Sequence, residues 1–325
     1  MAVPNSPPAL ASEQRRLPKV LTSSVIRAAD KGNSHGGLYL VDLETGAAEM
    51  VRDWDDPSIS WEGRGGDRGL RGIAFYGDEI IVAASDELFF FDKTFEIQSS
   101  LRNQYLRSTH EVFRTGDHLW VTSTEYDSIL RVDLRERRFD AGVHLTAKRI
   151  AGRTLAFGAR WFDPTTDGGP PRRDVLHINS VWGDELRLTV CGTQIRNILE
   201  VHKRHARRHL PVPLGTHNAR PFGNGAIAND TRGTRVVTTD RAGHESTLYP
   251  IKTYPASELI HDPGDPKRAR QGFGRGLCLH GSLVVTGSSP ATVTAFDLGC
   301  SEMVRTVNIS MDVRNAIHGL EVWPY

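Results

Sequence analysis

The chain has 325 residues, of which 38% are hydrophobic and 24% are charged, with 31 glycines and 17 prolines. This composition is typical of a turn-rich globular protein. Its 40 Lys and Arg residues nearly balance its 39 Asp and Glu residues, which excludes the strongly basic surface that drives sequence-independent binding to nucleic acid.

Other features indicate the environment of the protein. No stretch reaches the roughly 20 apolar residues that cross a bilayer. Residues 1–16 are rich in Pro, Ala and Ser and contain no apolar run after a basic start, so they do not resemble a secretory signal. The three cysteines, Cys191, Cys278 and Cys300, have no C-x-x-C spacing, which favours a reducing compartment. We therefore expect a cytoplasmic protein without membrane or nucleic-acid partners, whose residues 1–16 are disordered or loosely attached.

The predicted elements begin with two apolar runs, residues 20–26 and 37–43. An internal repeat follows, and its clearest copies are residues 71–92, 110–133 and 275–297, with weaker copies beginning at His177 and His217. Each clear copy has three short apolar runs separated by turns rich in Gly, Asp and Asn. This pattern predicts antiparallel strands joined by hairpins. Residues 194–209 are the exception and are predicted as a short helix or an irregular outer strand.

The last apolar run, residues 317–323, has the form of a first strand without later partners. The two runs near the N-terminus supply those partners, so we predict one blade built from both termini, which removes an open sheet edge. First strands at Arg71, His110, His177, His217, Arg275 and His318 then predict an all-β, six-bladed β-propeller over residues 17–325. Insertions around residues 151–173 and 254–271 are expected in loops over one face.

The same position of each repeat carries His110, His177, His217 and His318 in four copies and Arg71 and Arg275 in two. First strands line the channel of a propeller, so these six side chains should form a ring about its axis. Imidazoles that converge in this way are ligands for Zn, Fe, Cu or Mn. The two guanidiniums would hold a carboxylate or phosphate beside the metal.

Simpler interpretations of the ring stay open. Each His or Arg can merely hydrogen-bond backbone carbonyls around a water-filled channel. The arginines can pair with Glu111 or Glu321, and the same two acids can instead orient a histidine. Glu125 and Tyr126, in the loop after a second strand, are candidate acid-base groups at the channel entrance. Arg64 and Arg68 in a glycine-rich turn are candidates for the channel mouth, and His202, His205 and His209 are interpreted as a solvated face.

The anchors resemble the motifs of an uncharacterised bacterial family of six-bladed propellers: Thr109-His110-Glu111-Val112, His177-Ile178-Asn179, His217-Asn218-Ala219-Arg220 and Arg275-Gly276-Leu277. The resemblance spans most of the chain from Arg71 onward and places it among propellers of the NHL or senescence-marker type. It implies the fold and the importance of these motifs, and it supplies no reaction. Asn179, Asn218 and Arg220 of these motifs are predicted to contact the substrate.

More distantly, the ring is similar to that of peptidyl-hydroxyglycine lyase, whose propeller holds zinc with histidines beside an arginine and a tyrosine. Four histidines are also found in carotenoid-cleaving oxygenases, whose propeller has seven blades. We expect a metal-dependent lyase, isomerase or hydrolase that acts on a small anionic substrate, with a divalent transition metal on the four histidines. The alternatives are a binding module without chemistry, a metal-dependent oxygenase, and a calcium-dependent lactonase, for which carboxylate ligands are scarce in the ring.

Overall fold

The structure is a computed structural model that describes residues 16–29, 32–55, 69–150, 153–184, 187–261 and 269–325. The expectation of disorder at the N-terminus and the positions of Arg64 and Arg68 lie outside these residues. Strands make up nearly all the regular structure, and within the described residues the helical elements are two 3₁₀ turns, η1 (Thr124–Tyr126) and η2 (Ala256–Glu258). The prediction of an all-β fold is therefore confirmed.

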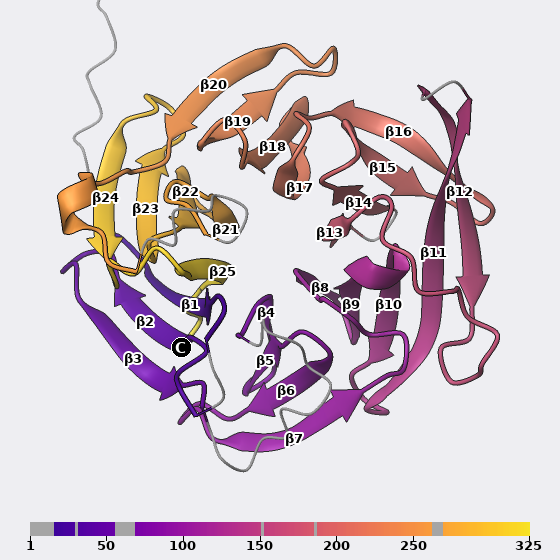
Figure 1. The fold of residues 1–325 in the computed structure, drawn as a ribbon, viewed down its shortest axis with the longest axis horizontal. Helices are drawn as coiled ribbons and strands as arrows, with labels where there is room; N and C mark the ends of the chain where they lie inside the picture. Colours follow the sequence, from indigo (N-terminus) through magenta and orange to yellow (C-terminus); the bar gives the residue numbers. More distant parts are fainter. Residues whose placement is uncertain (1–15, 30–31, 56–68, 151–152, 185–186, 262–268) are drawn as a thin grey trace, which may run out of the picture.

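The sheets stand side by side around a central axis, each with its first strand innermost (Figure 1). The first contains β25 (Asn315–Val322), β1 (Lys19–Ile26), β2 (Gly37–Asp42) and β3 (Ala48–Asp53), in that order. The next contains β4 (Ile73–Tyr76), β5 (Glu79–Ala83), β6 (Glu87–Phe91) and β7 (Ile97–Arg102). Two further four-stranded sheets contain β17 (Thr216–Phe222), β18 (Gly225–Asp230), β19 (Arg235–Thr239) and β20 (Glu245–Pro250), and β21 (Arg275–His280), β22 (Leu283–Ser288), β23 (Thr292–Asp297) and β24 (Met303–Asn308).

A nine-stranded sheet completes the ring (Figure 1). It contains β8 (Val112–Thr115), β9 (His118–Ser123), β10 (Ser128–Asp133), β11 (Arg138–Ile150) and β12 (Arg153–Phe162), followed in space by β16 (His205–Pro211), β15 (Asn197–Val201), β14 (Leu188–Gly192) and β13 (Ile178–Gly183). The two halves join where Phe157 pairs with Ala206 and Gly158 with His205. Part of the insertion expected near residues 151–173 is thus the outer strand β12. Residues 194–209 were predicted as a short helix or an irregular outer strand. The structure has strands at residues 197–201 and 205–211, so the helix is wrong.

The sheet that contains both termini forms as predicted. β25 lies antiparallel to β1, with Val20 opposite Val322 and Ile26 opposite Asn315. Because these strands pair, the ring closes without leaving the inner strand of that sheet unpartnered. The prediction of a β-propeller is therefore supported by the sheet arrangement as well as by the strand content.

Burial explains which residues form which strand. Middle strands are sandwiched between neighbouring sheets, so β6 is buried on both faces and reads Glu-Leu-Phe-Phe-Phe, whereas the outermost β3 and β7 are largely exposed and polar. Clusters of apolar side chains fill the spaces between sheets, and one of them joins Trp54 to Phe89 at 4.9 Å between ring centroids. Burying each such side chain contributes about 2 kcal/mol. In the part of the chain that the structure describes, no helix has the length and apolar character needed to cross a bilayer.

Candidate functional site

The four predicted histidines come together at the inner ends of the sheets. The ring centroid of His110 lies 5.4 Å from that of His177, 6.0 Å from that of His217 and 6.2 Å from that of His318. His217 and His318 are buried, with 4% and 3% of their surfaces exposed, whereas His110 and His177 are partly exposed. The repeat therefore located a cluster of imidazoles that the sequence separates by up to 208 residues.

Hydrogen bonds fix which nitrogen of His110 carries the proton. Its Nδ1 lies 2.8 Å from the carbonyl oxygen of Ser108 and 2.9 Å from Thr124 Oγ1. A carbonyl oxygen only accepts, and Thr124 already donates its hydroxyl proton to the carbonyl of Ile178 at 2.6 Å. Nδ1 is therefore the donor, and the lone pair of neutral His110 is on Nε2.

The same reasoning applies to His217 and His177. Thr231 Oγ1 donates to the carbonyl of Gly274 at 3.2 Å, so it accepts a proton from His217 Nδ1 at 2.9 Å. Nε2 of His217 is buried and has no hydrogen-bond partner among the described residues. His177 Nδ1 lies 2.9 Å from a carboxylate oxygen of Asp174. Three imidazoles thus donate through Nδ1 to oxygens outside the cluster, which leaves each Nε2 available to a ligand.

The site favours uncharged histidines. Burial, followed by the positive charges of Arg71 and Arg275, holds the pKa of His110 well below its usual range. Burial and the charge of Arg275 have the same effect on the pKa of His217 and of His318. These imidazoles are therefore neutral at neutral pH and present lone pairs rather than positive charge.

Both predicted arginines belong to this cluster. Arg275 Nη1 lies 3.2 Å from Nδ1 and 3.1 Å from Nε2 of His318, and such equal distances place the guanidinium over the ring face. Arg71 is 3% exposed and precedes β4, where its backbone N–H donates to the carbonyl of Ala83 at 2.7 Å. Its positive charge lowers the pKa of both His110 and His318.

The three residues predicted to contact the substrate also form hydrogen bonds within the protein, and their contact with a substrate stays a prediction. Asn179 Nδ2 donates to the carbonyl of Thr216, and Asn218 Oδ1 accepts from Asn229 Nδ2 and from the N–H of Gly276. Arg220 donates to the carbonyl of Leu277 at 2.5 Å. The bonds to Thr216, Gly276 and Leu277 join inner strands of neighbouring sheets, and the bond to Asn229 joins β17 to β18 within one sheet. The three side chains therefore help to position the site.

Glu111 belongs to the same network. Its carboxylate accepts from Asn218 Nδ2 and the N–H of Val181, and it lies 3.7 Å from Arg220 Nη2. No hydrogen bond joins it to a histidine among the described residues. Glu321 lies beside it, and burial together with the charge of Glu111 raises the pKa of Glu321 to about 7, against the lowering effect of Arg220. A cavity of about 10 Å³ next to His110 and His318 is lined by both acids and has room for roughly one water.

Glu125 and Tyr126 are neighbours in η1, but Glu125 has polar contacts and Tyr126 packs among apolar side chains. Glu125 accepts a hydrogen bond from Ser108 Oγ at 2.6 Å and forms an ion pair with Arg172. Since the carbonyl of Ser108 accepts from His110, Glu125 steadies the loop that orients this histidine. The ring of Tyr126 packs against Tyr105, with centroids 5.5 Å apart, in the apolar cluster beside β9 and β10.

Sequence reasoning missed Asp127, which follows η1. Its carboxylate accepts the backbone N–H groups of Val175, Leu176 and His177 at 2.8 to 3.0 Å. It has a positive φ of 45°, a conformation that Asp adopts more readily than most residues, and His177 has a φ of 55°. The signal in the sequence that could have indicated it is an acid in the turn between two predicted strands.

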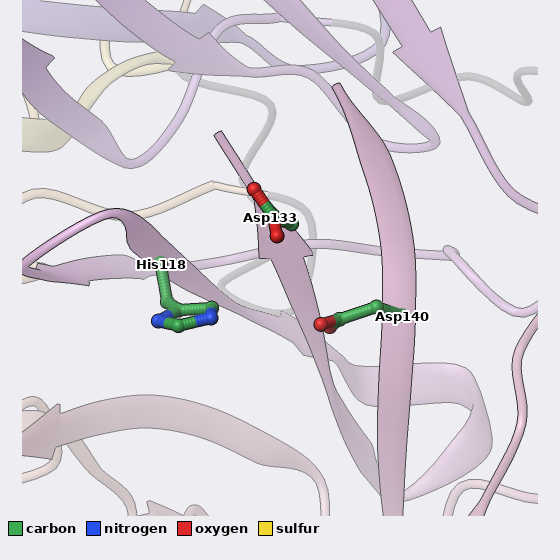
Figure 2. A group of neighbouring side chains, drawn as sticks. All are labelled: His118, Asp133 and Asp140. Atoms are coloured by element: carbon green, nitrogen blue, oxygen red, sulfur yellow. The ribbon is translucent and has the colours of Figure 1, made fainter. Parts of the chain in front are cut away.

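A second possible metal site lies away from the axis, at the ends of three adjacent strands. His118 of β9, Asp133 of β10 and Asp140 of β11 turn toward one another (Figure 2), and their ligand atoms all lie within 4.8 Å. Within the described ranges this is the one group of three or more His, Cys, Asp or Glu residues that is so compact, so the nitrogens of the channel histidines are spread more widely. Asp140 is held by Arg131 in two hydrogen bonds of 2.9 Å.

No family model matches the chain, and no curated protein does. Solved structures match over nearly the whole length. A protein of unknown function from Bacteroides caccae covers 94% of this chain and 98% of its own at 10% identity, with a TM-score of 0.55. A structure from the nidogen/laminin complex covers 93% and 97% at 13% identity, with a TM-score of 0.54. At identities this low, both structures show a likeness of fold alone.

Proposed function

We propose that the chain is a metal-dependent lyase, isomerase or hydrolase that acts on a small anionic substrate at the centre of a six-bladed propeller. The blade count is supported by the sheets, since the nine-stranded sheet contains two antiparallel runs, β8 to β11 and β13 to β16, with β12 between them. Together with the four-stranded sheets these give six units, in agreement with the six repeat anchors. A resemblance to the uncharacterised bacterial propeller family accords with this count.

The observation that carries the proposal is the combination of neutral imidazoles and guanidiniums in one cluster. His110 and His217 present Nε2 lone pairs, which attract a cation or a hydrogen-bond donor, and His177 is oriented by Asp174 through its Nδ1. Arg71 and Arg275 attract an anion. A metal ion that carries an anionic substrate satisfies both groups, whereas an anion without a proton to donate would leave the lone pair on the buried Nε2 of His217 unsatisfied.

The chemistry of the donors fits a divalent transition metal, because three of the four imidazoles have their tautomer fixed by an oxygen on the far side. The spacing fits less closely. Two imidazoles that share one ion at about 2.1 Å place their centroids roughly 5 Å apart, and those of His110, His177 and His217 lie 5.4 and 6.0 Å apart. These three must therefore move inward by small side-chain rotations. His318, whose face is covered by Arg275, is the fourth ligand of the proposal.

When bound, such a metal polarises a substrate oxygen or activates water. The protein's own residues do the remaining work. Arg71 and Arg275 bind and orient the anionic group, and Thr124, Thr231 and Asp174 hold the imidazoles. Burial of the cluster excludes bulk water, which strengthens each of these electrostatic contacts. If the metal is redox-active, the same site supports an oxygenase reaction.

A binding module without chemistry is the second candidate, and the wide spacing of the histidine nitrogens favours it. In this case the arginines hold an anionic ligand or protein segment, and each Nε2 accepts a hydrogen bond from it.

Metal content distinguishes the two. Protein purified without a histidine tag should contain about one Zn, Mn, Fe or Cu ion per chain, measured by plasma mass spectrometry. His177→Ala should lose most of it, since His177 is partly exposed and tolerates truncation. The matched control is His118→Ala, which removes the compact group of Figure 2 and should leave the channel metal in place. Metal-free protein that gains neither metal nor melting temperature on addition of these ions would overturn the metal-dependent function. Metal lost only from the His118 variant would overturn the ligand assignment.

A further inference from the structure

Strand register produces the compact group of His118, Asp133 and Asp140, called here the His118 group. His118 is the first residue of β9 and stands opposite Asp133, the last residue of β10. The register of β10 with β11 shifts between Arg131 and Val132, which leaves Asp140 as the extra residue of a β-bulge. A bulge re-aims a side chain. Here it brings Asp140 toward His118 and Asp133 (Figure 2).

Both carboxylates of the group are oriented by donors that lie outside it. Asp133 Oδ1 accepts the backbone N–H groups of Arg135 and Glu136 at 2.9 and 3.0 Å. Asp140 accepts two hydrogen bonds of 2.9 Å from Arg131, one on each oxygen. Because a carboxylate has about four lone-pair sites, both acids keep acceptor positions that these bonds do not use. Hydrogen bonds of this kind also fix the orientation of carboxylates that ligate metals.

The imidazole of His118 completes a mixed set of nitrogen and oxygen donors. It is partly exposed, and in the described part of the chain no hydrogen bond joins its ring to another residue. Zn²⁺ takes imidazole and carboxylate ligands together, whereas Mg²⁺ and Ca²⁺ prefer oxygen ligands. The donor set therefore favours zinc.

The spacing of the ligand atoms is close to what zinc requires. These atoms all lie within 4.8 Å of one another, and all three residues are partly exposed. Ligand atoms about 2.0 Å from a tetrahedral zinc ion lie roughly 3.3 Å apart. Small rotations of the three side chains supply the difference.

The His118 group is remote from the channel histidines. Thr124, which hydrogen-bonds His110, directly follows the last residue of β9, whereas His118 is the first residue of that strand. Six residues of extended chain span roughly 20 Å. An ion bound to the His118 group would therefore take no part in a reaction in the channel.

We propose that His118, Asp133 and Asp140 form a second metal site, which binds a Zn²⁺ ion and ties β9, β10 and β11 together. This inference goes beyond the proposed function and does not depend on it. Arg131 offsets part of the charge of Asp140, so this site binds zinc more weakly than the channel and fills when zinc is added. Because the ion binds the folded sheet, it raises the melting temperature.

The test is titration of metal-free, untagged protein with Zn²⁺ against a competing chelator, in a His177→Ala background that lacks one channel histidine. This protein should bind about one zinc ion per chain and gain melting temperature. Adding His118→Ala should weaken zinc binding by more than about tenfold and abolish the gain. Asp133→Asn can still accept the N–H groups of its turn but loses the negative charge, so it should weaken zinc binding by about tenfold.

His244→Ala in the same background is the matched control. His244 is an exposed histidine beside one carboxylate, that of Asp240 at 3.1 Å, rather than two. This substitution should leave zinc affinity and melting temperature unchanged. Zinc binding that survives His118→Ala, or that falls equally in the His244 variant, would overturn the second site.

A different outcome separates this site from the proposed function. Zinc binding that depends on His118, in protein that loses no metal on His177→Ala, would uphold the second site and overturn the metal-dependent reaction. Circular dichroism of each metal-free variant confirms that it is folded, so that a loss of zinc reports on the ligands.

Discussion

Asp127 accepts the backbone N–H of His177 through Oδ1 at 2.9 Å, across fifty residues of sequence. The same carboxylate binds the N–H groups of Val175 and Leu176. One acid therefore sets the path of the chain into β13 and, with it, the position of a proposed metal ligand.

Replacing this acid tests its role. Asp127→Asn keeps the shape but cannot accept three charge-assisted bonds, so we expect a loss of about 2 kcal/mol in the free energy of unfolding. Urea denaturation measures it. Asp163→Asn is the control, since Asp163 is an exposed turn residue that binds Thr165, and it should change stability by less than about 1 kcal/mol. Equal effects of the two substitutions would contradict a special role for Asp127.

Thr231 offers a test of the histidine tautomer. Thr231→Val preserves the shape and removes the oxygen that accepts from His217 Nδ1, and it leaves the carbonyl of Gly274 without this donor. We expect a loss of about 1 to 3 kcal/mol in stability and, under the proposed function, a metal affinity lower by about 10- to 100-fold. Thr231→Ser, which keeps the hydroxyl, should retain both. Metal titration with a competing chelator gives the affinity, and a Val variant with parental affinity would count against the tautomer.

The pH dependence of stability has two opposing sources. His110, His217 and His318 have folded pKa values below the unfolded value near 6.5, so their unfolded forms bind more protons and stability falls as the pH drops below about 6.5. Glu321 has a raised pKa of about 7 against an ordinary value of 4.5, so its folded form binds the proton and stability falls as the pH rises from about 5 to 7.

Glu321→Gln removes the second source alone. Denaturation midpoints between pH 5 and 8 should therefore rise more steeply with pH in this variant than in the parent. The difference in the free energy of unfolding between the variant and the parent should change by up to about 3 kcal/mol over this pH range. Parallel pH profiles would show that Glu321 titrates normally.

Gly319 connects the closing strand to Arg71. Its N–H donates to Ser23 Oγ at 2.8 Å, and this hydroxyl donates to the carbonyl of Arg71 at 2.5 Å. A Cβ at Gly319 would lie 2.2 Å from that carbonyl oxygen, which belongs to the backbone and cannot rotate away. Gly319→Ala should therefore cost about 1 to 3 kcal/mol and weaken anion binding. The control, Gly168→Ala, meets its nearest atom at 3.6 Å and should be nearly neutral. If the Gly319 variant is destabilised but binds anions like the parent, the packing of the closing strand β25 does not influence the anion site at Arg71.

The repeat made much of this fold predictable. Strand alternation and turn residues are local, so the sheets, the pairing of β1 with β25 and the gathering of His110, His177, His217 and His318 follow from the sequence. The pairing of β12 with β16 could not be predicted from the sequence, because these two outer strands come from different repeats and meet only after the sheets have formed.

The sequence also did not predict the residues that orient the histidine site. Thr231 and Asp127 lie in turns or loops, where side-chain direction depends on the tertiary path rather than on the repeat. Conversely, Asn179, Asn218 and Arg220 occupy motif positions that suggested ligand contacts, and the structure engages them in bonds between strands. The sequence motifs did not reveal these internal partners, and contact of the three residues with a substrate stays a prediction.

The pairing of β1 with β25 also affects the order in which the protein folds during its synthesis. Thr22 Oγ1 donates to the carbonyl of Gly319, 297 residues away, and contacts of such long range form late because loop closure is costly in entropy. His318 lies on the same strand. During synthesis the ring cannot close, and the fourth histidine cannot join the other three, until β25 has left the ribosome.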